Sequence, residues 1–133
     1  MLVLNRRIGE SIRIGDAVRL TIRAKLRAHL TVSLVAPADL TITDEGDVPI
    51  EPTTHRRCSK RYLIAMLAGD SLRIGEEIVV CLGHHAIGGW LGLARGRQIP
   101  IGIDAPQAVP VHREEIYQRI QRGEPAPRRE EHD

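Results

Sequence analysis

The sequence has very few aromatic residues, with no Phe, one Trp and two Tyr in 133 residues. A core must then be built from Ile, Leu, Val and Ala, and a platform of aromatic rings for stacking single-stranded nucleic acid is excluded. Long apolar runs are also missing, so no segment is expected to span a membrane. At the amino terminus the apolar residues precede the charged ones, which is the reverse of the order in a signal peptide. We therefore expect a cytoplasmic protein.

Cysteine is scarce as well, and in the cytoplasm Cys58 and Cys81 are expected to be reduced thiols. His55 with Cys58, and Cys81 with His84 and His85, have short spacings that zinc ligands can have. This signal is weak, because a cysteine in an apolar strand such as Cys81 is more often a core residue. We expect no metal and no cofactor. The net charge of +2 does not by itself indicate an acidic partner, although a local basic stripe still can.

Alternating apolar and polar residues fill most of the first 43 positions. The longest alternation, over residues 18–26, places five apolar side chains on one face, which is typical of a half-buried strand. These side chains are Val18, Leu20, Ile22, Ala24 and Leu26. The whole segment predicts five short strands. The acidic, proline-containing and then basic residues 44–60 break this pattern and predict a linker.

The pattern then begins again as an internal repeat. Residues 9–16 (GESIRIGD) return 60 positions later as residues 69–76 (GDSLRIGE), and Ala36-Pro37 returns 69 positions later as Ala105-Pro106. A glycine-rich insertion near residues 84–92 accounts for the longer second copy. Each copy is too small to bury a core alone. The sequence therefore predicts a mainly β pseudo-dimer of two intertwined repeats, with a single antiparallel domain of chance similarity as the alternative.

These patterns divide the chain into four segments. We predict a first repeat over residues 1–43 that lacks a helix and a linker over residues 44–60. A second repeat with a helix follows over residues 61–122, and a disordered tail over residues 123–133.

Residues 109–120 (VPVHREEIYQRI) change from strand to helix periodicity in the middle. Glu115 and Arg119 are four positions apart and are expected to pair along the helix. His112 and Arg113 stand at the junction. A hydrogen-bond donor and a permanent cation at such a point indicate a contact outside the fold.

With these segments in view, the chain resembles the CsrA/RsmA family of carbon storage regulators, which are bacterial post-transcriptional regulators. The similar segments are residues 1–10 (MLVLNRRIGE), 74–78 (IGEEI), 101–106 (IGIDAP) and 109–120. The resemblance implies intertwined units of five short strands and a helix, in which the first strand of one unit lies beside the fifth strand of the other. It also implies binding of GGA sequences in RNA loops near ribosome-binding sites, and thereby control of translation.

Carried over residue by residue, the resemblance implies one RNA site between the first strand of repeat one and the last strand of repeat two. Its cations would pair with phosphates, and its apolar residues would give bases a surface to lie on. The implied RNA-binding residues are Leu4, Asn5, Arg6, Arg7, Ala105, Pro106, Val109, Val111, His112 and Arg113.

At the corresponding second site, Met66 and Leu67 replace the two arginines, and Thr43 and Asp44 replace His112 and Arg113. A carboxylate where a phosphate would lie repels it, so this second site is expected not to bind RNA.

The sequence thus predicts a non-enzymatic translational regulator that binds GGA loops of mRNA or small RNA at one site per chain. We expect a monomeric pseudo-dimer that is able to associate further. The alternative function is a protein-interaction module or antagonist that uses the apolar residues 64–67. Arg6 and Arg7 have a plainer interpretation as edge-strand charges, and Arg113 as a helix-start residue paired with a carboxylate.

Overall fold

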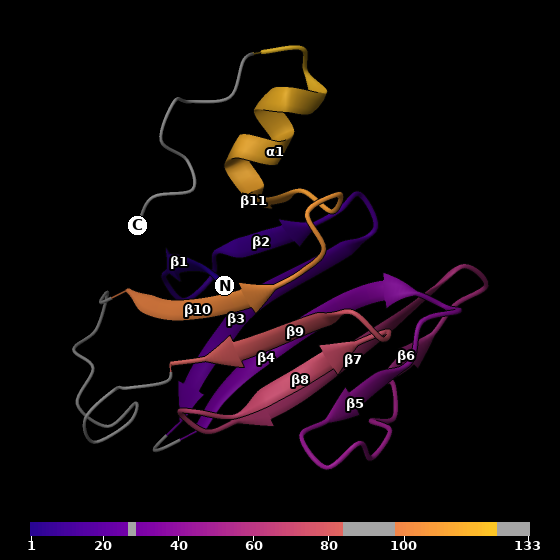
Figure 1. Cartoon of the computed structure of the whole chain (residues 1–133). Coiled ribbons are helices and arrows are strands. Elements are labelled where there is room, and N and C mark those ends of the chain that lie inside the picture. Colours follow the sequence, from indigo (N-terminus) through magenta and orange to yellow (C-terminus); the bar gives the residue numbers. More distant parts are fainter. Residues whose placement is uncertain (27–28, 84–97, 125–133) are drawn as a thin grey trace.

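The computed structural model describes residues 1–26, 29–83 and 98–124, which form two antiparallel β-sheets and one helix (Figure 1). This confirms the predicted mainly β fold with a C-terminal helix. The insertion predicted near residues 84–92 and nearly all of the tail predicted over residues 123–133 lie outside the described residues. Within the described part of the chain, no helix is long and apolar enough to cross a bilayer.

Sheet A has five strands in the order β1, β10, β9, β8, β5. Its two outer strands come from the first part of the chain, and its three central strands come from the second. The strands are β1 (Leu2–Arg6), β10 (Ile99–Asp104), β9 (Ile78–Leu82), β8 (Ser71–Ile74) and β5 (Ile42–Asp44).

Sheet B has the converse composition and one additional strand, in the order β11, β2, β3, β4, β7, β6. Its central strands come from the first part of the chain, and β11 and β7 come from the second. Each sheet therefore combines strands of both parts. The strands are β11 (Val111–Arg113), β2 (Ser11–Ile14), β3 (Val18–Leu26), β4 (His29–Pro37), β7 (Ser59–Met66) and β6 (Thr54–His55).

The strand register repeats with the two offsets seen in the sequence. Leu4 lies opposite Ile101 where β1 pairs with β10, and Ile64 lies opposite Val32 where β7 pairs with β4. Ile64 follows Leu4 by 60 positions, and Ile101 follows Val32 by 69. The two halves of the fold are therefore related by an approximate two-fold correspondence.

Two matched glycines join the end of one part to the first turn of the other. Gly15 and Gly75 have φ angles of +63° and +66°, a conformation that side chains other than glycine rarely adopt. The Gly15 N–H donates to the Pro110 carbonyl at 2.7 Å, and the Gly75 N–H donates to the Thr41 carbonyl at 2.9 Å. Each bond fixes the approach to an outer strand, β11 in one case and β5 in the other.

The inward faces of the two sheets pack on each other and form a single aliphatic core. Tyr62, which is 2% exposed, is the largest buried side chain among the described residues. The core takes apolar residues from both parts of the chain, as the lack of Phe predicts. Its fully covered members, all 0% exposed, are Leu4, Ile12, Ile22, Leu30, Val32, Leu34, Ala36, Val80, Leu82 and Ile101.

The helix α1 (Glu114–Gln121) lies at one end of the molecule, beyond β11 and β2 (Figure 1). Ile116 is its buried residue. The helix ends in a Schellman motif. Gly123 has a φ of +83°, its N–H donates to the Ile120 carbonyl at 3.0 Å, and the Glu124 N–H donates to the Arg119 carbonyl at 2.9 Å. The last turn therefore has defined partners for its carbonyl groups.

The predicted linker, residues 44–60, contains the strand β6, and β7 already begins within it at Ser59. One local expectation was wrong. Ala24 was expected to face the core, yet it is exposed, because the pairing of β3 with β4 shifts register between Ile22 and Ala24. The bulge adds one residue to β3, so Ala24 does not continue the alternation that puts Ile22 in the core.

Candidate nucleic-acid interface

The two strands predicted to form the site are both outer strands. β1 ends sheet A and β11 ends sheet B, so each has one edge that pairs with no described strand. Leu4 and Arg6 point into the molecule, whereas Arg7 is exposed beyond the end of β1. The backbone of an outer strand can donate and accept hydrogen bonds with an external ligand.

A groove brings together several of the predicted residues near the start of β1. Its volume is about 560 Å³, and Leu2 of β1 lies on one side of it. The predicted residues in its lining are Ala105, Pro106, Val109 and Val111. The loop after β10 and the outer strand β11 therefore meet β1 at this groove, although more than a hundred residues separate them in sequence.

Arg6 does not have the exposed position that the sequence suggested. It is 4% exposed, and its guanidinium donates to both carboxylate oxygens of Glu115, each at 2.8 Å. A further bond of 3.0 Å goes to the Ser11 carbonyl, and a Glu10 oxygen lies 3.4 Å away. Arg6 is therefore occupied inside the fold and joins β1 to the start of α1. It is not available as a surface cation in this arrangement.

The same correction applies to Leu4 and Val111. Leu4 is 0% exposed and Val111 is 7% exposed, because both belong to the inward faces of their strands. Neither side chain offers a surface on which a base can lie. Their contribution to an outside ligand is restricted to backbone groups, while Val109 is half-buried and lines the groove.

His112 and Arg113 leave β11 on opposite sides. His112 lies opposite Arg13, on the outer face of sheet B, whereas Arg113 lies opposite the core residue Ile12. Arg113 is half-buried and therefore stands on the side of β11 that faces sheet A and β1. The structure thus directs Arg113, but not His112, toward the space between the two outer strands.

A second ion pair, which the sequence did not predict, holds the other side of α1. Arg13 donates to both oxygens of Glu114, at 2.9 and 2.8 Å, and its guanidinium lies 4.3 Å from the centre of the Tyr117 ring. The Tyr117 hydroxyl donates to Asp16 at 3.2 Å. The alternation of apolar and polar residues in this strand indicated that Arg13 points outward. No feature of the sequence indicated its partner, Glu114, which is a hundred residues away.

These contacts lower the pKa of both helix carboxylates. For Glu115, the hydrogen bonds from Arg6 are the main cause, and they outweigh the opposing effect of burial. For Glu114, burial is the largest influence and raises the pKa, but the hydrogen bonds from Arg13 and Gln118, together with the charges of Arg13 and Arg19, outweigh it. The expected pair of Glu115 with Arg119 does not form, since Glu115 bonds to Arg6 and Arg119 lies 3.9 Å from Glu124.

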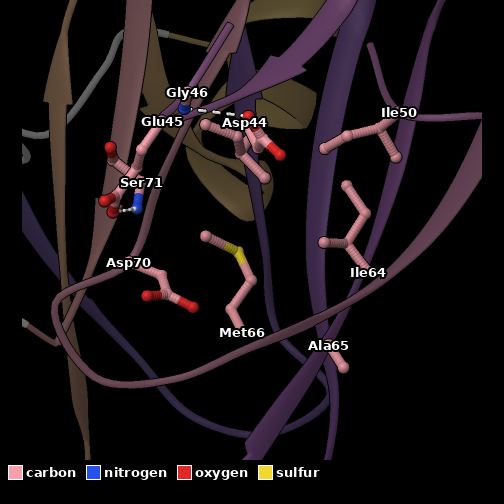
Figure 2. Close-up of a pocket in the computed structure, with 10 residues that line it drawn as sticks. Asp44, Glu45, Gly46, Ile50, Ile64, Ala65, Met66, Asp70 and Ser71 are labelled. Atoms are coloured by element: carbon pink, nitrogen blue, oxygen red, sulfur yellow. Dashed lines mark hydrogen bonds between the residues drawn. The ribbon is translucent and has the colours of Figure 1, made fainter. Parts of the chain in front are cut away.

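The matched position in the other half of the fold has a pocket instead of this ion pair. Met66 occupies the place of Arg6 and is 2% exposed, and Gly46 occupies the place of Glu115. The pocket has a volume of about 270 Å³ (Figure 2). In Figure 2, the Met66 and Asp70 side chains point into this hollow. No described helix follows β5, so the volume that α1 helps to cover on the other side is open here.

The predicted replacements at this second position lie where the register places them. Thr43 lies opposite Arg73, as His112 lies opposite Arg13. The Asp44 carboxylate, in the place of Arg113, accepts hydrogen bonds from the Gly46 and Val48 N–H groups at 2.9 and 3.0 Å. Leu67 is 42% exposed, where Arg7 is exposed in the first half. This edge therefore has a carboxylate and apolar groups in place of cations.

The outer edge of β7 is covered, whereas the outer edge of β1 pairs with no described strand. Thr54 and His55 of β6 pair with Arg61 and Lys60 of β7. The Thr53 hydroxyl accepts a bond of 3.0 Å from the Leu63 N–H. The chain itself thus occupies the edge that corresponds to the outer edge of β1.

No group of three or more metal-ligating side chains occurs within residues 1–26, 29–83 and 98–124. Cys58 is exposed and Cys81 is half-buried, and neither forms a disulfide with the other. Burial raises the pKa of the Cys81 thiol, and the nearby acids Glu45 and Asp104 add to this effect. His84 and His85 lie outside the described residues.

The two sheets exchange strands between the two parts of the chain. A helix follows the outer strand β11, and arginines lie where β11 and β1 meet. These features define an intertwined β-sheet protein in which one pair of outer strands differs from the matched pair. The comparison of the sequence with protein families identifies this class. The model of the CsrA family, described as a global regulator protein family, matches residues 1–45 and 92–122, more than half of the chain. The chain belongs to the CsrA family, a family of non-enzymatic RNA-binding regulators. No solved structure matches it.

Proposed function

We propose that the protein is a translational regulator of the cytoplasm that binds one GGA-containing loop of an mRNA or small RNA per chain. RNA is bound where β1 and β11 meet, through backbone groups of both strands, the residues of the 560 Å³ groove, and the Arg7 and Arg113 cations. Unpaired bases in loops offer edges that backbone groups and arginine forks can read. The two repeats in one chain replace the two subunits of a dimer.

The observation that carries this proposal is the ion pair between Arg6 and Glu115, which occurs on one side of the approximate two-fold only. Arg7 directly follows one partner of this pair, and Arg113 precedes the other by two positions. Arg6 thereby positions both cations at the junction of the two outer strands. The matched side has Met66, Gly46 and the Asp44 carboxylate, and β6 covers the edge of its first strand.

The test is a titration of the full chain with a GGA hairpin RNA, in which isothermal titration calorimetry measures the binding. We expect one RNA per chain. In the Arg113→Gln variant, we expect affinity to fall by about 1–3 kcal/mol, together with a smaller dependence on salt. Asp44→Arg is the matched variant at the other edge and should change binding little, because Met66 and the covering strand β6 remain. Two equivalent RNAs per chain, or parental binding by Arg113→Gln, would show that the assignment is wrong.

A second candidate function has one observation in its favour. Leu63, within β7, and Leu67, just beyond its end, are 54% and 42% exposed, and the residues between them line the 270 Å³ pocket. Exposed apolar groups of this kind suit a protein partner. A folded parent protein that binds no GGA RNA at low salt would favour this function, a protein-interaction module or antagonist, over RNA regulation.

A further inference from the structure

The outer face of sheet B carries a continuous row of residues from one edge of the sheet to the other. Each member lies directly opposite the next across a strand pair, so all of them point to the same side of the sheet. The neighbouring row contains the core residues Ile12, Leu20 and Leu34, which confirms that this row faces outward. From edge to edge, the row is His112, Arg13, Arg19, Val35, Arg61 and Thr54.

A pocket lies at the far end of this row, at the edge formed by β7 and β6. Its volume is about 320 Å³, and it is lined by Val35, Thr54, Arg56, Ser59 and Arg61. The turn between β6 and β7 shapes it, since the Arg56 N–H donates to the Ser59 carbonyl at 2.8 Å. Two guanidinium groups and two hydroxyl groups therefore surround one hollow whose lining contains no acid.

The charges of this pocket are not neutralised within the described part of the chain. None of the ion pairs found there involves Arg19, Arg56 or Arg61. By contrast, Arg6 and Arg13 are each bound to a carboxylate of α1. Arg19, one strand beyond Arg13, has no ion pair among the described residues, although its charge contributes to the lowered pKa of Glu114, and the cations farther from α1 are Arg56 and Arg61 at the edge of the sheet.

The matched row on sheet A lacks this property. Arg73 corresponds to Arg13, but Val79 stands in the place of Arg19 and Asp104 in the place of Val35. The positive charge is therefore concentrated on the outer face of one sheet, although the whole chain has a net charge of only +2. Arginine forks beside hydroxyl groups are the donors that phosphate oxygens prefer in nucleic-acid complexes.

We propose that the pocket of Arg56 and Arg61 is a phosphate site that binds the backbone of the same RNA, outside the GGA segment. This inference rests on the proposed function, and it assigns a second contact to the RNA. Four strand spacings of about 4.8 Å separate β11 from β7, a distance of about 19 Å along the row. At about 3.4 Å per stacked nucleotide, a flank of about six nucleotides spans that distance, with Arg19 beneath it. RNA recognition at the pocket is by phosphate and does not depend on the base sequence of the flank.

The experiment compares a short GGA RNA with the same RNA extended on each side by about ten uridines, more than the length of flank that reaches the pocket. We expect the parent to bind the extended RNA more tightly. The double variant Arg56→Gln/Arg61→Gln should lose about tenfold in affinity for the extended RNA at low salt, with a salt slope smaller by about 1.4. Its affinity for the short RNA should not change. Arg73→Gln, an exposed arginine on sheet A, is the matched control and should behave as the parent does.

The two proposals fail in different ways. Binding of the extended RNA by the double variant with parental affinity and salt slope would overturn the phosphate site and leave the GGA site intact. If the parent does not bind the short RNA, the GGA site fails, and a uridine oligonucleotide without GGA then tests the pocket alone. At low salt, this oligonucleotide should bind the parent and Arg73→Gln, and it should bind the double variant about tenfold more weakly. Equal binding by all three proteins contradicts the inference.

Discussion

At the scale of single residues, the ion pair between Arg6 and Glu115 combines a buried cation with a carboxylate that remains 55% exposed. Desolvation of Arg6 is offset because its guanidinium makes bonds of 2.8, 2.8 and 3.0 Å to Glu115 and to the Ser11 carbonyl. Hydrogen bonds to charged groups contribute about 1.5–3 kcal/mol each when a partner is removed. The pair therefore stabilises the junction of β1 and α1 more than an exposed ion pair would.

The chain itself suggests the substitution that tests this role, since Met66 fills the matched position. Arg6→Met should lower the free energy of unfolding by about 1–3 kcal/mol, because the Ser11 carbonyl and Glu115 lose their donor. Urea unfolding measures this change, and a double-mutant cycle with Glu115→Gln measures the coupling within the pair. We expect RNA affinity to fall while its salt dependence stays unchanged, because Arg6 positions neighbouring residues and does not itself contact phosphate. A variant with parental stability, or one with a reduced salt slope, would contradict this role.

The sequence indicated the importance of Arg6 but not how it acts. Residue spacing along a helix suggested Arg119 as the partner of Glu115, because a helical pattern reveals contacts between neighbours three or four positions apart. The true partner, Arg6, lies 109 positions away. The sequence grouped Arg113 with His112 as an outward-facing pair, whereas the register places Arg113 opposite Ile12, on the same side of β11 as Val111. Which arginine is buried depends on packing between sheets, and that packing has no local signal.

At the scale of elements, α1 is held to the sheets by carboxylates in its first turn. Glu114 and Glu115 receive the guanidinium groups of Arg13 and Arg6, so the start of the helix is bound to both β2 and β1. Only Ile116 of the helix is buried. The docking of α1 therefore depends on charge more than on apolar contact.

This dependence predicts a pH effect on stability. Both carboxylates have a folded-state pKa below the ordinary value of 4.5, so their contribution is complete above 4.5 and is lost as the pH falls through the lower folded values. Urea unfolding of the parent between about pH 6 and 3 should show this loss, and Glu114→Gln/Glu115→Gln should show a flatter profile. Amide exchange in residues 116–121 should increase over the same range. Parallel profiles for the two proteins would contradict the prediction.

The strand β6 is the element that sequence patterns failed to reveal. Its two residues, Thr54 and His55, are both exposed and lie between Pro52 and a basic segment, which is typical of a loop. They form a strand because β7 offers an unpaired edge within reach, and backbone groups are satisfied by any residue that can donate and accept. The register of the other strands, by contrast, followed from the repeat offsets of 60 and 69, since one face of every strand is buried.

At the scale of the whole molecule, four strand pairings connect the two parts of the chain. They are β1 with β10, β11 with β2, β5 with β8, and β4 with β7. Each part alone would leave these edges unpaired and half of the core open. The linker between them therefore acts by keeping two interlocked parts at high local concentration, and the pairings would persist without it.

This view predicts the result of cutting the linker. A protease site inserted after Glu51, an exposed residue between β5 and β6, should be cleavable in the folded protein. The fragments should stay together on size exclusion in native buffer, because the four strand pairings remain. Their unfolding should become dependent on concentration, with a loss of about 4 kcal/mol at micromolar protein relative to the millimolar effective concentration of a short linker. The uncut insertion variant is the control. Fragments that separate without denaturant would show that the linker, rather than the exchanged strands, holds the two parts together.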